Sequence, residues 1–167
     1  AGILHIETPP ESLVRSGGLF HGVQLWINLP AAKKWLAPNY QGLEGTDIAL
    51  ATSSDGGALV RVLAGTVAGH TGPGRSQSPI SIVHATLAPG ARIDLPWRAD
   101  FNALAYALSG SGQVGAAGQP ISGGQLAVLG KGDHITLEAA TSQSVATPSL
   151  EVLLLGGTPL REPVFAY

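Results

Sequence analysis

The stretch ISIVHATL, residues 80–87, is rich in β-branched and apolar residues and runs directly into the turn sequence APGA. Short runs of this kind, bounded by Gly and Pro, are typical of β-strands. Similar runs recur along the chain, and its 23 Gly and 12 Pro are spread between them as turn residues. We therefore predict strands over residues 2–7, 21–29, 59–65, 80–87, 103–110, 125–130, 134–139 and 150–156.

Helical patterning is confined to PAAKKWL, residues 30–36, where Pro30 suits a first helical turn and Pro38 ends the run. Many short strands with one short helix predict an all-β fold, an antiparallel β-sandwich or small barrel of the jelly-roll kind. The polar, Gly-rich segment ATSSDGGALV indicates a connection and places a boundary near residue 50. We expect residues 1–50 to be part of one β-unit, 51–155 a complete sandwich, and 156–167 a tail that packs back on the first unit.

Composition excludes several classes of function. Charged residues make up 12% of the chain and the net charge is -2, so no basic surface for nucleic acid is expected. No apolar run reaches the roughly 18 residues that span a bilayer. The absence of cysteine leaves His, Asp and Glu as the metal ligands and fits a cytoplasmic protein.

One stretch matches a nucleotide-binding motif, but the residues that follow it do not fit that function. GSGQVG, residues 110–115, matches G-x-G-x-x-G, yet Pro and Gly follow where the phosphate-binding helix would have to begin. A hairpin is the better interpretation. The chain also has no G-x-S-x-G sequence, which leaves a nucleophilic hydrolase without support.

His5 and Glu7 are the candidate metal ligands. Side chains alternate along a strand, so these two would share one face of the predicted strand 2–7. The pattern H-x-E also fits a core histidine beside a strand-end carboxylate. If that face is interior, burial of Glu7 without a cation would cost several kcal/mol, which favours a metal. His and carboxylate donors without sulfur suit iron(II), manganese or zinc.

The other four histidines are weaker candidates. His70 and His134 fall at turns or strand starts, where we expect them to face solvent. His84 shares a face with Ile80 and Ile82 and is expected to be a hydrogen-bonded core residue. His21 precedes the strand predicted over 21–29, and we expect it beside the first strand, supporting the ligands there.

Four segments together carry a resemblance to a known family: AGILHIETPP, HGVQLWINLP, LAPNYQ and PLREPVFAY. The chain resembles the pirin family, a branch of the cupins, over essentially its whole length. The resemblance begins inside the family's first cupin domain. It implies a complete C-terminal cupin and a partial N-terminal one, so we expect a piece of chain to precede Ala1.

The resemblance implies one mononuclear metal, usually iron, held in the first cupin by three histidines and a glutamate. His5 and Glu7 match the second pair of these ligands, and the first pair belongs to a segment that this sequence lacks. With two ligands missing, the chain is expected to bind Fe(II) weakly or not at all. In the second cupin, Pro96-Trp97-Arg98 stands where ligands would be, so that unit is expected to be a metal-free scaffold.

Two functions follow from the resemblance. The first is an iron-dependent flavonol (quercetin) 2,4-dioxygenase, in which Glu7 would ligate the metal and take the proton of the substrate hydroxyl. The alternative is a non-catalytic module that binds a regulatory protein partner, such as a transcription factor or a metabolic enzyme, without metal. The expected partners are thus a flavonol-like molecule or a protein, and neither nucleic acid nor a membrane.

Overall fold

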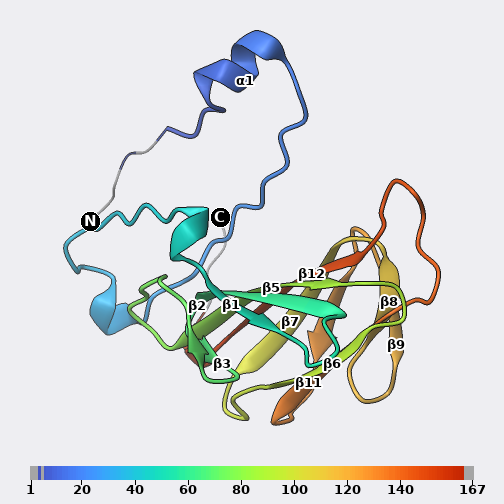
Figure 1. Cartoon of the computed structure of the whole chain (residues 1–167). Coiled ribbons are helices and arrows are strands. Elements are labelled where there is room, and N and C mark those ends of the chain that lie inside the picture. Colours follow the sequence, from blue (N-terminus) through green and yellow to red (C-terminus); the bar gives the residue numbers. More distant parts are fainter. Residues whose placement is uncertain (1–3, 5, 164–167) are drawn as a thin grey trace. The chain divides into compact units, whose positions relative to one another are not determined.

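A computed structural model describes residue 4 and residues 6–163 of the chain (Figure 1). The chain divides into two compact units, one formed by Ala1–Tyr40 with Glu162–Tyr167 and the other by Gln41–Arg161. The helices are α1 (Glu11–Ser16) and two 3-10 turns, Ala31–Lys33 and Gly45–Asp47. The strands are β1 (Ala49–Thr52), β2 (Ala58–Ala64), β3 (Thr66–Val67), β4 (His70–Thr71), β5 (Ile80–Leu87), β6 (Arg92–Pro96), β7 (Asn102–Ser109), β8 (Ser111–Val114), β9 (Gln119–Ser122), β10 (Leu126–Leu129), β11 (His134–Ala139) and β12 (Leu150–Gly157).

The second unit contains two antiparallel sheets that face each other. One has six strands in the order β1-β2-β5-β12-β7-β10, and the other has four in the order β6-β11-β8-β9. A separate two-stranded ribbon pairs β3 with β4. Every strand pair is antiparallel, so the prediction of an all-β antiparallel sandwich is confirmed.

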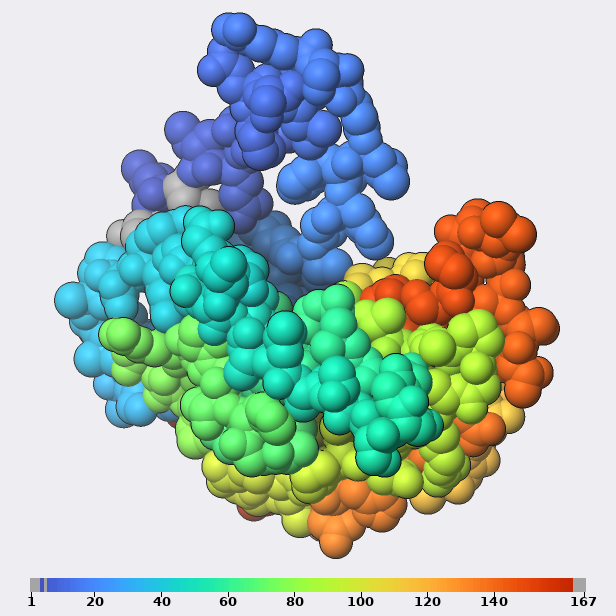
Figure 2. Space-filling model, in the orientation of Figure 1, coloured from blue at the N-terminus to red at the C-terminus, as the bar shows by residue number. Residues whose placement is uncertain are grey.

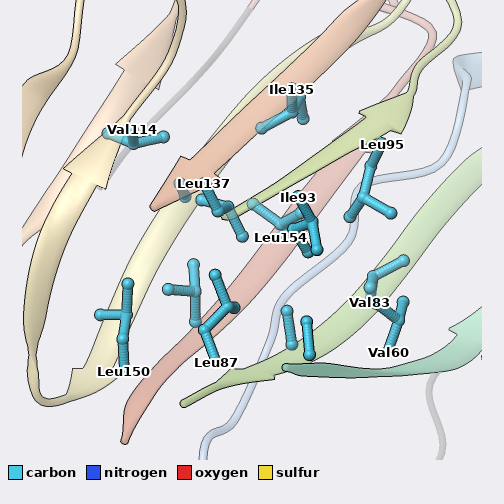
Figure 3. Packing of buried hydrophobic residues seen from close by; sticks show 14 of the residues in the cluster. Val60, Val83, Leu87, Ile93, Leu95, Val114, Ile135, Leu137, Leu150 and Leu154 are labelled. Carbon is cyan, nitrogen blue, oxygen red and sulfur yellow. The ribbon is translucent and has the colours of Figure 1, made fainter. Parts of the chain in front are cut away.

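Alternation along the strands builds the core. In β5 and β2 every second residue is buried, which is the pattern of a strand with one face against another layer. Figure 3 shows Val83 and Leu87 of the larger sheet pointing into the same interior as Ile93, Leu137 and Ile135 of the smaller sheet. The apolar residues of the two sheets thus form one continuous core.

A glycine permits the tight connection between β7 and β8. Gly110 has a φ of 78°, in the left-handed region, and a Cβ at this position would lie 2.2 Å from the carbonyl oxygen of Ser149. The stretch GSGQVG therefore forms the start of a hairpin, because β8 pairs with β9 through a turn at residues 115–118. The hairpin interpretation of this motif is confirmed.

The long loop between β11 and β12 stands out from the surface of the second unit, as the orange-red segment of Figure 2 shows. Val145 in this loop is fully exposed. Among the described residues, no helix has the length and apolar character needed to cross a lipid bilayer.

Six of the eight predicted strands are present, with ends that differ by one residue or less. The predicted strand over 21–29 is wrong, since these residues are not in a strand, and residues 4, 6 and 7 of the predicted strand 2–7 are likewise outside any strand. A strand needs a neighbour for its backbone hydrogen bonds, and no described residue of the first unit provides one. The predicted helix over 30–36 is a 3-10 turn at Ala31–Lys33 that continues as turn structure to Trp35.

The first unit contains a helix that was not predicted from the sequence. Helix α1 begins after Pro10, and Arg15 donates a hydrogen bond to Glu11 one turn earlier at 2.5 Å. Proline before a first turn and an acidic-to-basic pair four residues apart are the features that indicate such a helix. Near the other end of the chain, the Glu162 carboxylate accepts hydrogen bonds from the Ala31 backbone N–H at 2.9 and 3.1 Å. The predicted boundary near residue 50 and the packing of residues 156–167 stay predictions.

Candidate functional site

Glu7 lies on the wall of an open hollow in the first unit. The hollow has a volume of about 510 Å³, within the range of small-molecule sites. Its walls come from two segments on either side of α1, which reverses the chain and brings them together. The lining residues are Ile6, Glu7, Thr8, Pro9, Phe20, Gly22, Val23 and Gln24.

A hydrogen bond across the hollow holds the Glu7 carboxylate. Nε2 of Gln24 donates to Oε1 of Glu7 at 3.3 Å. Both side chains are exposed, so the carboxylate is open to solvent and to a ligand. Phe20 and Val23 add apolar surface beside it. The arrangement is a carboxylate, positioned by an amide, next to apolar walls.

Gln24 is a residue of this site that was not predicted from the sequence. Glu7 and Gln24 are 17 residues apart, and their meeting depends on how α1 reverses the chain. The one sequence feature that could have suggested the contact was the unpredicted helix. Because α1 was not predicted, the contact between Glu7 and Gln24 was not predicted either.

His5, the other predicted metal ligand, lies outside the described residues. The structure therefore does not test the predicted pairing of His5 with Glu7. Within residues 4 and 6–163, no cluster of three or more His, Asp or Glu side chains could hold a metal ion. Glu7 is an oxygen donor of the kind that iron(II), manganese and zinc accept. One carboxylate does not make a metal site, so the described residues alone do not fit a bound metal.

Three of the remaining histidines are exposed to solvent. His70 in β4 and His134 at the start of β11 are exposed, as predicted. His70 Nδ1 lies 3.0 Å from the Ala68 carbonyl oxygen, and His134 Nδ1 lies 2.7 Å from Oδ1 of Asp133. His21 is exposed and stands beside no strand of its own unit, so the strand pairing predicted for it is absent among the described residues.

His84 is paired, but it is not a core residue. It lies on the face of β5 opposite the core, and its Nε2 is 2.6 Å from Oε2 of Glu151, outside hydrogen-bond geometry. The same Glu151 oxygen accepts a hydrogen bond from Thr86, which in turn accepts one from Arg61. The prediction of a core histidine is wrong because Ile80 and Ile82, which share its face, lie on the outer side of the six-stranded sheet.

The facing antiparallel sheets are those of a cupin β-sandwich, and comparison with known proteins agrees. Residues 82–167 match the family model described as the Pirin C-terminal cupin domain. That match covers more than half of the chain, and the chain belongs to the pirin family. The resemblance found in the sequence is confirmed.

Relatives from animals, plants and bacteria align with nearly all of the chain. Pirin of Homo sapiens is 32% identical over 99% of the chain and 54% of that protein. Pirin-like protein 2 of Arabidopsis thaliana is 34% identical over 99% of the chain and 50% of that protein. A putative quercetin 2,3-dioxygenase of Pseudomonas aeruginosa is 32% identical over the whole chain and 56% of that protein. The chain thus spans about half the length of the relatives it matches.

A solved structure supports the same fold. The crystal structure of a quercetin 2,3-dioxygenase from Acinetobacter baumannii is 28% identical to the chain and superposes with a TM-score of 0.74. The match covers 85% of the chain and 47% of that protein.

Proposed function

We propose that the chain is part of a pirin-type flavonol dioxygenase that depends on iron(II), with Glu7 as its catalytic residue and His5 and Glu7 as two of the metal ligands. The observation that carries the proposal is the Glu7 carboxylate in an open hollow of about 510 Å³ with apolar walls. Two relatives that carry quercetin 2,3-dioxygenase in their names support the substrate class. We place the protein in the cytoplasm, since it has no cysteine that would need oxidation.

The protein's own residues would bind the flavonol and move its proton. Phe20 and Val23 offer apolar surface to a flat aromatic substrate. Glu7, held by the Gln24 amide, would accept the proton of the flavonol hydroxyl on a carboxylate oxygen. Iron(II), when bound, supplies the redox chemistry with dioxygen that no side chain of the hollow offers.

The experiment uses the protein as its own gene produces it, with its mass and N-terminal sequence measured first. Iron content is then determined, and oxygen uptake is followed together with the loss of flavonol absorbance on adding quercetin. In Glu7→Ala, we expect turnover to fall at least a hundredfold, since a general base contributes about that much or more. Bound iron is expected to fall as well, because a ligand is lost.

Glu11→Ala is the matched control. Glu11 is an exposed carboxylate in the same unit, paired with Arg15 and absent from the walls of the hollow. We expect this variant to keep wild-type turnover and iron content. Equal rates of quercetin loss in wild type and Glu7→Ala would refute the role of Glu7.

A regulatory protein-binding module without metal is the second candidate. The first unit exposes an unusual number of large apolar side chains, among them Leu4, Phe20 and Trp26. Exposed apolar surface of this kind favours a macromolecular contact. A purified natural protein without iron, and without quercetin-dependent oxygen uptake when iron is added, would favour this function over the first.

A further inference from the structure

A second hollow lies entirely within the sandwich unit, and the proposed dioxygenase function does not use it. It opens where β6, β8 and β10 end and where β7 and β11 begin. Its volume is about 160 Å³. A cavity of about 150 Å³ is large enough for one benzene ring, so this hollow fits a single six-membered ring and not a flavonol.

The floor of this hollow is apolar and aromatic. Trp97, Phe101, Ala103 and Ile135 line it and are buried. Trp97 is only 7% exposed, and its indole Nε1 has no hydrogen-bond partner among the described residues. A flat aromatic ligand would therefore meet two buried aromatic side chains, which favour stacked or edge-on ring contacts.

The rim carries one uncompensated positive charge. Lys131 is exposed at the mouth and forms no hydrogen bond or ion pair with any residue that the structure describes. Two other basic side chains nearby already have carboxylate partners. Arg98 lies over the Phe101 ring, 4.4 Å from its centroid, and donates hydrogen bonds to Asp100 at 3.0 and 2.7 Å.

His134, also on the rim, contacts Asp133. The pKa of Asp133 lies below its ordinary value, first because of the hydrogen bond with His134. The pKa of Asp100 is lowered in the same way by the hydrogen bond from Arg98. Both carboxylates therefore stay ionised at neutral pH and are hydrogen-bonded to these partners, whereas the Lys131 ammonium has no partner among the described residues.

We propose that this hollow binds a small aromatic carboxylate, with its ring on the floor formed by Trp97 and Phe101 and its carboxylate at the Lys131 ammonium. Trp97 stands in the segment where the family resemblance would place metal ligands, so an aromatic ring replaces the ligands there. The second cupin unit is then a ligand-binding module that works without a metal. This site shares no residue with the Glu7 hollow, and either proposal can fail without the other.

The test is an NMR titration of the chain with sodium benzoate, using the tryptophan indole N–H signals. Trp26 and Trp35 are 90% and 84% exposed, whereas Trp97 is buried, so the three signals report different surroundings. Trp26→Phe and Trp35→Phe assign them. We expect the Trp97 signal to shift saturably with benzoate, while the Trp26 and Trp35 signals stay in place.

Two lysine variants separate charge from shape. In Lys131→Gln, the Kd for benzoate is expected to rise about fivefold, the size of one exposed ion pair. The Kd for benzamide, the neutral analogue, is expected to stay within about twofold of its wild-type value. Lys34→Gln, which removes the same charge from an exposed residue of the first unit, is expected to leave benzoate binding unchanged.

Acetate, which has the charge but no ring, is expected to cause no saturable shift of the Trp97 signal. The proposal is overturned if benzoate leaves that signal unmoved, if acetate shifts it as well as benzoate does, or if Lys131→Gln binds benzoate as tightly as wild type. Since Lys131 is exposed, the variant should fold, and its unchanged signals elsewhere in the spectrum confirm this.

Discussion

The two units of the chain differ in how their apolar residues are used. In Gln41–Arg161, apolar side chains of two sheets form a continuous buried core. In the described part of residues 4–40 no side chain is buried, although Leu, Ile, Phe and Trp are frequent there. Glu7 and the other residues that line the candidate dioxygenase hollow belong to the first unit, where no described side chain is buried.

This difference shows that the residues that form the buried core and the residues of the proposed oxygenase site belong to different units. Strands β5, β7 and β12 pair on both edges and bury one face, so their residues contribute packing and backbone hydrogen bonds together. Glu7 and Gln24 contribute neither to a sheet nor to the core. Core substitutions in the second unit should therefore cost more stability than equivalent substitutions in the first unit.

The largest effect is expected from Leu154→Ala in β12. Leu154 is 0% exposed in the core between β5 and β7, and its truncation leaves a cavity. We expect the free energy of unfolding to fall by about 4 kcal/mol. Urea unfolding followed by circular dichroism measures it.

Leu19→Ala is the matched change in the first unit, since Leu19 is 92% exposed. Its effect on the free energy of unfolding is expected to stay within about 0.5 kcal/mol. Similar losses of stability in the two variants would break the comparison.

Gly110→Ala should give the next largest effect. The left-handed φ of 78° costs an alanine about 1 kcal/mol, and its Cβ would also meet the Ser149 carbonyl oxygen at 2.2 Å. We expect a total loss of about 3 kcal/mol in the free energy of unfolding.

Gly115→Ala separates the two causes. Gly115 has a φ of 77°, but a Cβ there has no heavy atom within 4 Å. Its cost is expected to be the backbone term alone, about 1 kcal/mol. If both variants lost the same stability, the close approach of the two backbones at Gly110 would have no energetic weight.

Six of the twelve strands of the second unit were predictable because each is an apolar run between turn residues. The runs at 80–87 and 134–139 begin and end at the predicted residues. The strands that were missed are two to five residues long, too short to show a pattern of their own: β1, β3, β4, β6, β8 and β9. Their place in the sheet depends on neighbours that no local pattern encodes.

The candidate site was less predictable than the fold. Glu7 could be selected from H-x-E and from the family resemblance, but Gln24 could not, because their contact depends on the chain reversal at α1. The second hollow could not be predicted from the sequence either. Trp97 and Phe101 share the connection between β6 and β7, whereas Lys131 lies in the connection between β10 and β11, and the topology brings these two connections together.

The smallest expected effect concerns the turn before β2. Asp55 accepts hydrogen bonds from Ser53 Oγ at 2.5 Å and from the Gly57 backbone N–H at 2.9 Å, and these lower its pKa, the Ser53 bond most. A folded-state pKa below the unfolded one adds stability at neutral pH. That stability begins to fall near pH 4, the ordinary range of an Asp carboxyl, and is lost as the pH falls through the folded pKa.

Unfolding titrations of wild type and Asp55→Ala between pH 2 and pH 7, a range that brackets ordinary Asp pKa values of about 4, test this prediction. The difference in stability between the two proteins should be largest at neutral pH and should shrink on acidification. A difference that stays constant across that range would show that the Asp55 charge has no part in the turn.

Amide hydrogen exchange of the whole chain tests the division between the two units most directly. If the core of Gln41–Arg161 provides the stability, amides of β5, β7 and β12 should exchange only through global unfolding, while amides of residues 6–40 exchange by local opening and faster by orders of magnitude. Protection in residues 6–40 equal to that of β5, β7 and β12 would contradict the account.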